Sequence, residues 1–292
     1  MPGVFLAPKT PGMRFEQVTI IGVGLIGGSV GLAVHARKLA ARVVGVGRDS
    51  KTLARAVELG AIDSFTVELS AGVKDADLVV VCTPVDRIAE VILAAMPHVR
   101  SGTIFTDAGS TKQNILSSLA GRLPEHVAYV PAHPLAGAEK AGVEHARADL
   151  FESRITITTP GPKADPKAVG RVEAFWESLG TRVVRMLPGD HDCILASTSH
   201  LPHAVASGVA AVTPTDWLPL TAGGFRDVTR IAAGDPELWA AIFLANCDPV
   251  LAALSAFTAR MADLTRLLNA GDGPGIVRWL TEAKQVRDAL GS

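Results

Sequence analysis

Val18-Thr19-Ile20-Ile21-Gly22-Val23-Gly24-Leu25-Ile26-Gly27 is the most informative stretch of this 292-residue chain. A short apolar run typical of a buried strand precedes three glycines with the spacing GxGxxG, and a helix-like run begins directly after them. Gly22 permits a tight turn, Gly24 lets the backbone approach a pyrophosphate, and Gly27 lets the helix pack on the strand. The N–H groups of Leu25 and Ile26 would bind phosphate oxygens at the helix N-terminus. This context predicts an α/β domain of the Rossmann type that binds a dinucleotide.

Composition and charge argue against several classes of protein. Hydrophobic residues make up 48% and charged residues 20% of the chain, and the net charge is −1, so neither a nucleic acid nor a membrane surface is an expected partner. No apolar stretch is long enough to span a bilayer. Three widely spaced cysteines (Cys82, Cys193 and Cys247) argue against a disulfide framework and a zinc site, and indicate a reducing cytosol.

Short β-branched runs alternate with helical patterns in the first part of the chain, which predicts a parallel sheet with crossover helices. The expected strands are residues 18–21, 42–46, 78–82, 102–106, 127–130, 154–159 and 181–186. An amphipathic stretch at 166–179 lies between the last two. Beyond 188–189 the β-branched runs end, and alanine and leucine dominate.

The chain is therefore expected to divide into a flexible tail (1–13), a dinucleotide-binding domain (14–187) and an all-α substrate and dimerisation domain (188–292). Apolar residues at helical spacing predict a long helix near 251–268, which Pro249 should kink or interrupt. The helical domain is apolar enough that we expect it to pack on a second copy of the chain, forming a homodimer. The alternative is that it buries this face against its own first domain.

The end of the second expected strand bears on which dinucleotide is bound. An acidic residue there normally bonds the ribose hydroxyls of NAD, but this chain has Gly47 at the expected position and Arg48 next. A guanidinium can pair with a 2′-phosphate, which favours NADP. Asp49 keeps NAD open, because a shift of one residue would restore an acid. Thr83 and Pro84, directly after a later strand, are further expected cofactor contacts.

Four clusters of polar residues lie where loops should meet the nicotinamide. They are 107–112, 133–140, 199–204 and 223–230, the last followed by Trp239. His133, after a strand, is a natural general base, Ser110 could hydrogen-bond its ring, and Arg230 could clamp a carboxylate. His200 and His203 have helical spacing, so a metal site must be weighed, but no third ligand lies in sequence range.

Three of these stretches carry a resemblance to a known family. HPLAG (133–137) with Glu139, SHLPH (199–203) and GGFRDVTRIA (223–232) occur in the order seen in the prephenate/arogenate dehydrogenase family of tyrosine biosynthesis. The resemblance runs from residue 18 to about residue 290. It implies an oxidative decarboxylation: a ring hydride passes to the nicotinamide, the ring carboxylate leaves as carbon dioxide, and the ring becomes aromatic.

The resemblance also implies roles for residues that match the family pattern. His133 matches the catalytic histidine, and Ser110 matches the serine that orients it. The matched substrate-binding residues are Arg230, His203, His200, Glu139 and Trp239. Activity should fall at low pH as His133 becomes protonated, and Arg230 with a partly protonated His203 should balance the charge of a dianionic substrate.

Several alternatives stay open on the sequence alone. His203 favours prephenate over arogenate as substrate. A dehydrogenase of the β-hydroxyacid type is disfavoured, because it would place a lysine base where this chain has Ser199, His200 and His203. A non-catalytic nucleotide sensor would not need His133, Ser110 and Arg230 together. With no chorismate mutase segment before Val18 and no regulatory domain after the helices, we expect a monofunctional enzyme.

Overall fold

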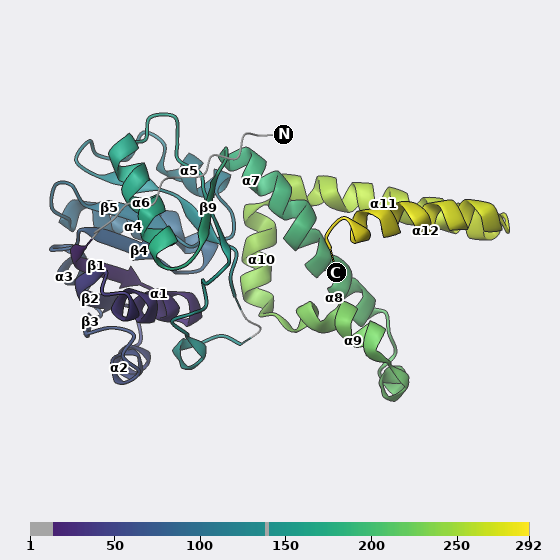
Figure 1. Ribbon diagram of the computed structural model, residues 1–292, viewed down its shortest axis with the longest axis horizontal. Helices are drawn as coiled ribbons and strands as arrows, with labels where there is room; N and C mark the ends of the chain where they lie inside the picture. The colour runs from purple at the N-terminus through teal and green to yellow at the C-terminus, as the bar shows by residue number, and fades with distance from the viewer. Residues whose placement is uncertain (1–13, 138–139, 292) are drawn as a thin grey trace. The chain divides into compact units, whose positions relative to one another are not determined.

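A computed structural model describes residues 14–137 and 140–291, so the expected tail at 1–13 lies outside the described residues. Six parallel strands form the main sheet in the order β3-β2-β1-β4-β5-β6 (Figure 1). They are β1 (Phe15–Ile21), β2 (Ala40–Val46), β3 (Ser64–Thr66), β4 (Leu78–Val81), β5 (Ile104–Asp107) and β6 (Ala128–Val130). The order reverses between β1 and β4, which is where doubly wound sheets bind their ligands. The predicted Rossmann-type domain is confirmed.

Helices cover both faces of this sheet, which explains the fully apolar strand β4. They are α1 (Leu25–Ala36), α2 (Ser50–Glu58), α3 (Leu69–Val73), α4 (Ile88–Ala95), α5 (Gln113–Leu119) and α6 (Pro166–Ser178). Leu78 and Val80 point into one buried cluster, with α1 and α6, whereas Val79 and Val81 point into the other, with α4 and α5. This alternation is the two-residue period of a strand that is buried on both sides.

The later strands do not join the main sheet, which corrects the expectation of one parallel sheet. β7 (Ala132–Pro134), β8 (Ile155–Thr158) and β9 (Arg182–Arg185) form a separate sheet in which β7 runs antiparallel to β8. The strands expected at 154–159 and 181–186 exist, but sequence reasoning missed β3 and β7. β7 has three residues and ends in a proline, so it shows no alternating pattern that could predict it.

The chain after β9 is helical, as predicted. It contains α7 (Pro188–Leu195), a π-helical turn (Ala196–His200), α8 (Leu201–Ala211), α9 (Gly223–Thr229) and α10 (Pro236–Ala245). Ile242 of α10 is buried in the same cluster as Val85, in the 3₁₀ turn that follows β4. These helices therefore belong with the sheet in one compact unit, which ends at Asn246.

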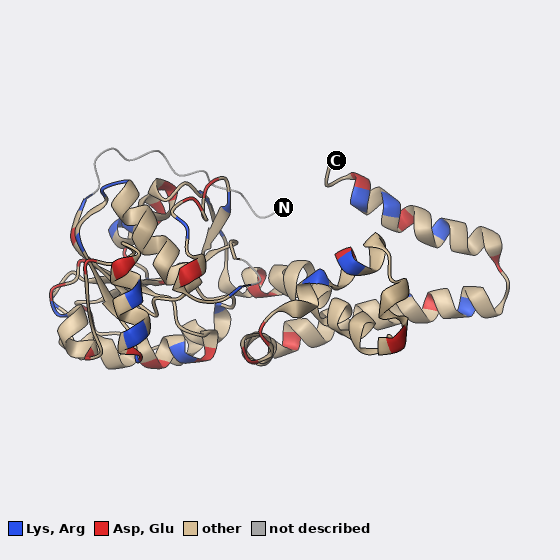
Figure 2. Cartoon of the chain, turned by 90° about the horizontal axis from the view of Figure 1, so that it is seen from below, with Lys and Arg blue, Asp and Glu red and all other residues tan. Residues whose placement is uncertain are grey.

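The second compact unit begins at Cys247 and consists of the hairpin of α11 (Cys247–Asn269) and α12 (Gly273–Asp288). Arg260 of α11 lies 5.0 Å from the ring centroid of Trp279 of α12 and forms an ion pair with Glu282. Both signs of charge are interspersed along α12 (Figure 2).

The expectation that Pro249 kinks or interrupts the long helix is wrong. α11 begins at Cys247, so Pro249 lies in its first turn, where a backbone N–H has no partner within the helix and its loss costs little. In the described part of the chain no single helix is long and apolar enough to cross a membrane; α10 and α11 satisfy that length-and-composition test only when they are taken together.

Candidate active site

The glycine-rich turn lies between β1 and α1, as predicted. Its three glycines differ in why a side chain would or would not be tolerated there. Gly22 has a φ of +91°, and a Cβ there would lie 2.8 Å from the carbonyl oxygen of Cys82. A Cβ on Gly27 would lie 2.2 Å from the carbonyl oxygen of Gly22. Gly24 has open space at that position, and no described side chain caps α1 there. The first N–H groups of α1 are therefore not capped by a described side chain, and the open position at Gly24 would let a pyrophosphate approach them.

Thr83 and Pro84 follow β4 at the same edge of the sheet. The backbone nitrogen of Thr83 lies 3.0 Å from where a Cβ of Gly22 would be. The Thr83 hydroxyl oxygen is buried and has no hydrogen-bond partner within the described residues. Such a group beside the glycine turn suits a hydrogen bond with a bound dinucleotide.

Asp49, the acidic residue that kept NAD open as the cofactor, already has hydrogen-bond partners within α2. The Asp49 carboxylate caps α2 by accepting hydrogen bonds from the Lys51 and Thr52 backbone nitrogens, at 3.0 and 3.3 Å, and from the Thr52 hydroxyl, at 2.7 Å. The Thr52 hydroxyl is the main cause of the lowered pKa of Asp49. Arg48 is exposed next to it. A carboxylate that serves as a helix cap is poorly placed to bond ribose hydroxyls as well.

His133 lies on β7 and not in a loop, and its ring is held by residues that sequence reasoning missed. Its Nδ1 lies 2.9 Å from Nε2 of His191, on α7. Nδ1 of His191 in turn lies 2.7 Å from Oδ1 of Asp192. His191 is fully buried, whereas His133 is half-buried and so has an accessible side. A His-Asp dipeptide directly after the change of pattern at 188–189 was the signal that could have pointed to this pair.

The surroundings of these rings favour their neutral forms. Burial lowers the pKa of His133 well below 6.5, and the neighbouring His191, Lys112 and His200 act in the same direction. Burial also lowers the pKa of His191, although its hydrogen bond to Asp192 opposes this effect. A neutral imidazole at His133 can accept a proton at neutral pH, as a general base must.

A buried ion pair lies beneath β7. The Lys112 ammonium pairs with Asp107 and donates to the Ala132 carbonyl oxygen at 2.8 Å. The other Asp107 oxygen accepts from the Tyr129 hydroxyl at 2.9 Å and from the Ala132 N–H at 3.1 Å. Burial lowers the pKa of Lys112 while Asp107 opposes that shift. This network fixes the residue before His133 from both sides, and removing one partner of such a pair costs about 3–5 kcal/mol.

Ser110 lies in the loop between β5 and α5 and is half-buried. Among the described residues, the side chain hydrogen-bonded with the His133 ring is that of His191 and not that of Ser110. The role assigned to Ser110, which is to orient the histidine and the substrate hydroxyl, stays a prediction for the complex with substrate.

His200, His203 and Trp239 lie together. The His203 and Trp239 rings stack with centroids 3.5 Å apart and planes 11° apart, and the His200 ring centroid is 6.2 Å from that of Trp239. Nδ1 of His200 lies 3.1 Å from the side-chain nitrogen of Asn246. The same Asn246 nitrogen donates to the Asp192 carbonyl oxygen at 2.8 Å.

Both histidines of this group are buried, which bears on the charge expected at His203. Burial lowers the pKa of His200 to about 4 and also lowers that of His203, which works against the partly protonated His203 expected from the sequence. The buried Nδ1 of His203 has no partner within the described residues, which leaves it free to bond a substrate. No group of three metal-ligating side chains occurs in the described part of the chain.

Arg230 begins the 3₁₀ turn Arg230–Ala233, which contacts α8, the helix that carries His203. Arg230 is exposed and already interacts with a neighbour. Just beyond the turn, a Cβ on Gly234 would lie 2.6 Å from the Trp239 indole nitrogen and 3.2 Å from the His203 ring. The turn is thus packed against the His203–Trp239 stack. Glu139, the remaining expected substrate contact, lies outside the described residues.

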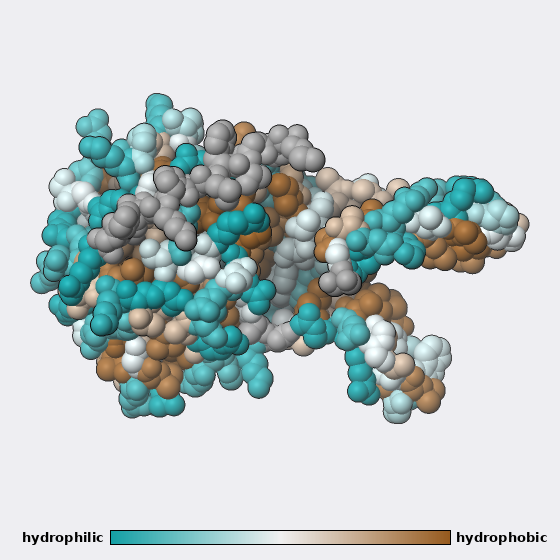
Figure 3. All heavy atoms as spheres, viewed as in Figure 1, coloured by the Kyte–Doolittle hydropathy of each residue, from teal (hydrophilic) through white to brown (hydrophobic). Residues whose placement is uncertain are grey.

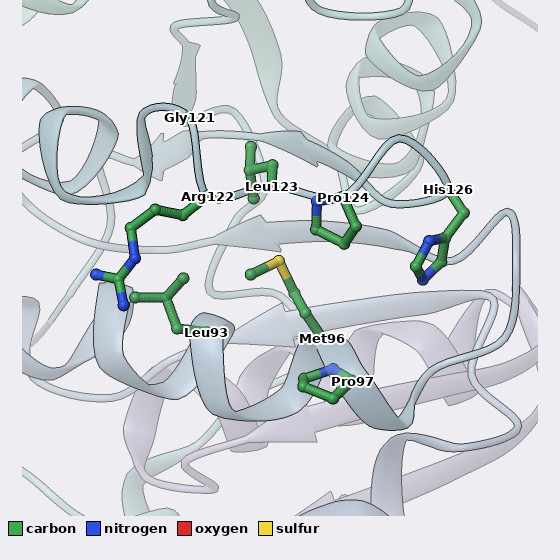
Figure 4. Close-up of a pocket in the computed structure, with 8 residues that line it drawn as sticks. All are labelled: Leu93, Met96, Pro97, Gly121, Arg122, Leu123, Pro124 and His126. Atoms are coloured by element: carbon green, nitrogen blue, oxygen red, sulfur yellow. The ribbon is translucent and has the colours of Figure 1, made fainter.

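A cavity of about 600 Å³ lies elsewhere (Figure 4). Residues from the end of α4 onward and residues between α5 and β6 line it, including Met96, Arg122 and His126. These segments lead into the amino ends of β5 and β6, whereas the glycine turn follows the carboxyl end of β1. The cavity therefore lies at the other edge of the sheet and contains none of the expected site residues.

Comparisons with known proteins show the family to which this chain belongs. Residues 30–185 match the family model "Prephenate dehydrogenase, nucleotide-binding domain", and residues 187–282 match "Prephenate dehydrogenase, dimerization domain". The chain belongs to the prephenate dehydrogenase family. The expected family, fold class and enzyme class, a nicotinamide-dependent oxidoreductase, are confirmed.

Similar members of the family include enzymes with different names. The cyclohexadienyl dehydrogenase of Zymomonas mobilis is 36% identical, over 94% of this chain and 96% of that protein. The prephenate dehydrogenase of Bacillus subtilis is 33% identical, over 94% of this chain and 76% of that protein. The crystal structure of Aquifex aeolicus prephenate dehydrogenase with hydroxyphenyl propionate and NAD⁺ has a TM-score of 0.87 and 31% identity, and covers 97% of this chain and 100% of that chain.

Proposed function

We propose that this family member oxidises prephenate to 4-hydroxyphenylpyruvate and carbon dioxide, with NADP⁺ as the hydride acceptor. The observation that carries the proposal is the half-buried His133, whose Nδ1 lies 2.9 Å from Nε2 of His191. Its Nε2 is the ring nitrogen left to face a substrate. A base of this kind is what removal of hydride from a carbinol carbon requires.

The reaction then follows from the roles of the side chains. A nicotinamide dinucleotide held at the turn of Gly22, Gly24 and Gly27 would supply the hydride acceptor for the ring carbon that carries the hydroxyl. His133 Nε2 accepts the hydroxyl proton as the carbon–oxygen double bond forms. Loss of the ring carboxylate as carbon dioxide makes the ring aromatic, and His133 returns the proton to the phenolate oxygen. Aromatisation drives the decarboxylation, so this step needs no further acid or base.

The substrate's two carboxylates need partners. Arg230 supplies a guanidinium that suits a bidentate bond to one of them, and its turn packs on α8. His203 acts as a neutral hydrogen-bonding group, since burial lowers its pKa. Trp239, stacked on His203, forms an apolar wall for the ring. Glu139 and His200 remain proposed contributors, Glu139 to a charged network and His200 to the pocket wall.

The preference for NADP⁺ is supported by the end of β2. Arg48 is exposed, Gly47 carries no acid, and the Asp49 carboxylate is used as the cap of α2. A 2′-phosphate would therefore meet a cation and no free carboxylate. NAD⁺ remains the alternative.

A homodimer in a reducing cytosol is the proposed state of the enzyme. Apolar surface is visible on the α11–α12 hairpin (Figure 3). Leu268, Val277 and Val286 of this hairpin are exposed at 60%, 63% and 72%. The matched family model is described as a dimerization domain, which supports burial of this face against a second copy. We propose that the sequence boundary between the two family domains lies at 187–188, inside the compact unit that ends at Asn246; the family models, which end at 185 and begin at 187, support it. We propose neither a nucleic acid nor a membrane as a partner.

Arogenate is the second candidate substrate, favoured by the 36% identity to a cyclohexadienyl dehydrogenase. The test is the initial rate of reduced-nicotinamide formation, with prephenate or arogenate and NAD⁺ or NADP⁺ in all four pairings. We expect the highest kcat/KM with prephenate and NADP⁺. A higher kcat/KM with arogenate would replace the substrate, and no turnover in any pairing would overturn the proposal.

A further inference from the structure

His191 is a fully buried histidine with both ring nitrogens in hydrogen bonds to charged or catalytic neighbours. One nitrogen faces the Asp192 carboxylate, and the other faces the His133 ring. Each nitrogen of a neutral imidazole either donates or accepts but cannot do both. The proton positions along Asp192, His191 and His133 are therefore linked.

The Asp192 end sets the direction of this chain. A carboxylate carries no proton and can only accept hydrogen bonds. Its Oδ1 accepts from the Lys112 backbone N–H at 2.8 Å, and its Oδ2 accepts from the Gln113 backbone N–H at 2.8 Å, at the start of α5. Both oxygens accept from backbone N–H groups, which can only donate, and Oδ1 also accepts a hydrogen bond from Nδ1–H of His191.

The rest follows from one proton per ring. If Nδ1 of His191 carries its proton, Nε2 of His191 is an acceptor, and Nδ1 of His133 must be the donor at 2.9 Å. His133 is then left with an unprotonated Nε2. We propose that His191 and Asp192 are positioning residues that hold His133 in its Nδ1–H tautomer, so that Nε2 is the reacting base; this rests on the proposed function.

The charged groups around the rings agree with neutral histidines. Lys112 from the loop before α5 and His200 from the π-helical turn both act against a positive charge on His133. Asp192 and Asp107 are the carboxylates that face His191, and their effect on it is smaller than that of burial. A free imidazole favours the Nε2–H tautomer, so the enzyme has to impose the other one.

The first test reads the tautomer directly in the resting protein. Long-range ¹H–¹⁵N correlation spectra of the full chain, labelled with ¹⁵N-histidine, distinguish the two tautomers, and a His133→Asn variant assigns the His133 signals. We expect a protonated Nδ1 and an unprotonated Nε2 at neutral pH. An Nε2–H signal for His133 would overturn the proposal, whether or not the enzyme turns over prephenate.

The second test changes the acceptor. His191→Leu removes it, whereas His191→Gln keeps an oxygen that accepts from His133 Nδ1–H. We expect His191→Leu to lower kcat by about 10- to 100-fold, with KM for the substrate changed less than about threefold, and to produce a mixture of His133 tautomers. His191→Gln should restore most of kcat and the single tautomer.

Outcomes of these tests separate the two proposals. His98→Leu, the same change at an exposed histidine, is the control and should match the wild type. A His133 spectrum that is unchanged in His191→Leu, or equal losses of kcat in the Leu and Gln variants, would contradict positioning by His191. The expected spectra combined with no turnover of prephenate or arogenate would leave the positioning intact and refute the proposed function.

Discussion

His133 shows how a single residue acquires its chemistry from neighbours distant in sequence. The histidine itself could be chosen from the sequence, because HPLAG follows a strand and resembles a family motif. Its hydrogen-bond partner could not, because His191 lies 58 residues away and reaches it only through the packing of α7. The ion pair of Lys112 with Asp107 below β7 likewise depends on the fold.

The pH dependence of the enzyme should reflect the buried position of His133. Burial lowers its pKa well below 6.5, and only the neutral ring accepts a proton. As pH falls through 6.5, kcat/KM should therefore stay constant, and it should fall only at clearly lower pH, where the ring becomes protonated. A pH profile of kcat/KM checks this, and an acid limb centred at or above 6.5 would contradict it.

Cofactor choice is a second prediction for a single side chain. Arg48→Ala should raise KM for NADP⁺ by about tenfold, since a charge-assisted pair with the 2′-phosphate is lost, and leave KM for NAD⁺ nearly unchanged. Arg55→Ala is the control, because it removes another exposed arginine, which lies on α2 and pairs with Glu58 of the same helix. An unchanged NADP⁺ constant in Arg48→Ala would show that Arg48 is not the phosphate contact.

At the scale of elements, strands buried on both faces were the easiest to predict. β4 reads as four consecutive apolar residues, and the structure places them alternately in two clusters. β7 was missed because its three residues carry no period, and the second sheet was missed because strand pairing depends on contacts across 20 or more residues. Pro249 was misjudged because the start of α11 was not known.

The turn between β1 and α1 gives a prediction at this scale. Gly24→Ala should fold normally, because its Cβ would meet open space at an ordinary φ of −96°, but it should weaken dinucleotide binding at least about tenfold by filling the pyrophosphate space. Thermal unfolding and fluorescence titration with NADPH measure the two effects.

Gly170→Ala provides the matched control for this substitution. Gly170 lies inside α6, and its added Cβ would also meet open space, so the change should stabilise the protein by about 0.5–1 kcal/mol and leave NADPH binding unchanged. Unchanged binding in Gly24→Ala would refute the pyrophosphate role of the turn.

At the scale of the whole molecule, the exposed apolar side chains of the α11–α12 hairpin predict self-association. Sedimentation should give a mass of twice the 30.4 kDa of one chain. Leu280→Glu, at an apolar residue that is 54% exposed, should shift the protein toward the monomer because it places a charge in the buried face.

Arg287→Glu, a charge change at an exposed polar position of the same helix, is the control and should leave the dimer intact. A monomeric wild type, or a dimer unaffected by Leu280→Glu, would remove this hairpin as the interface.

Turnover of prephenate by the wild type and by His133→Asn, measured beside NADPH affinity, examines the whole account in one comparison. The wild type should form NADPH and 4-hydroxyphenylpyruvate in equal amounts. His133→Asn should lose about 10²- to 10⁴-fold in kcat, since it lacks the base, and bind NADPH within twofold of the wild type. Near-normal turnover in His133→Asn, or a wild type that binds NADPH but leaves prephenate unchanged, would contradict the account.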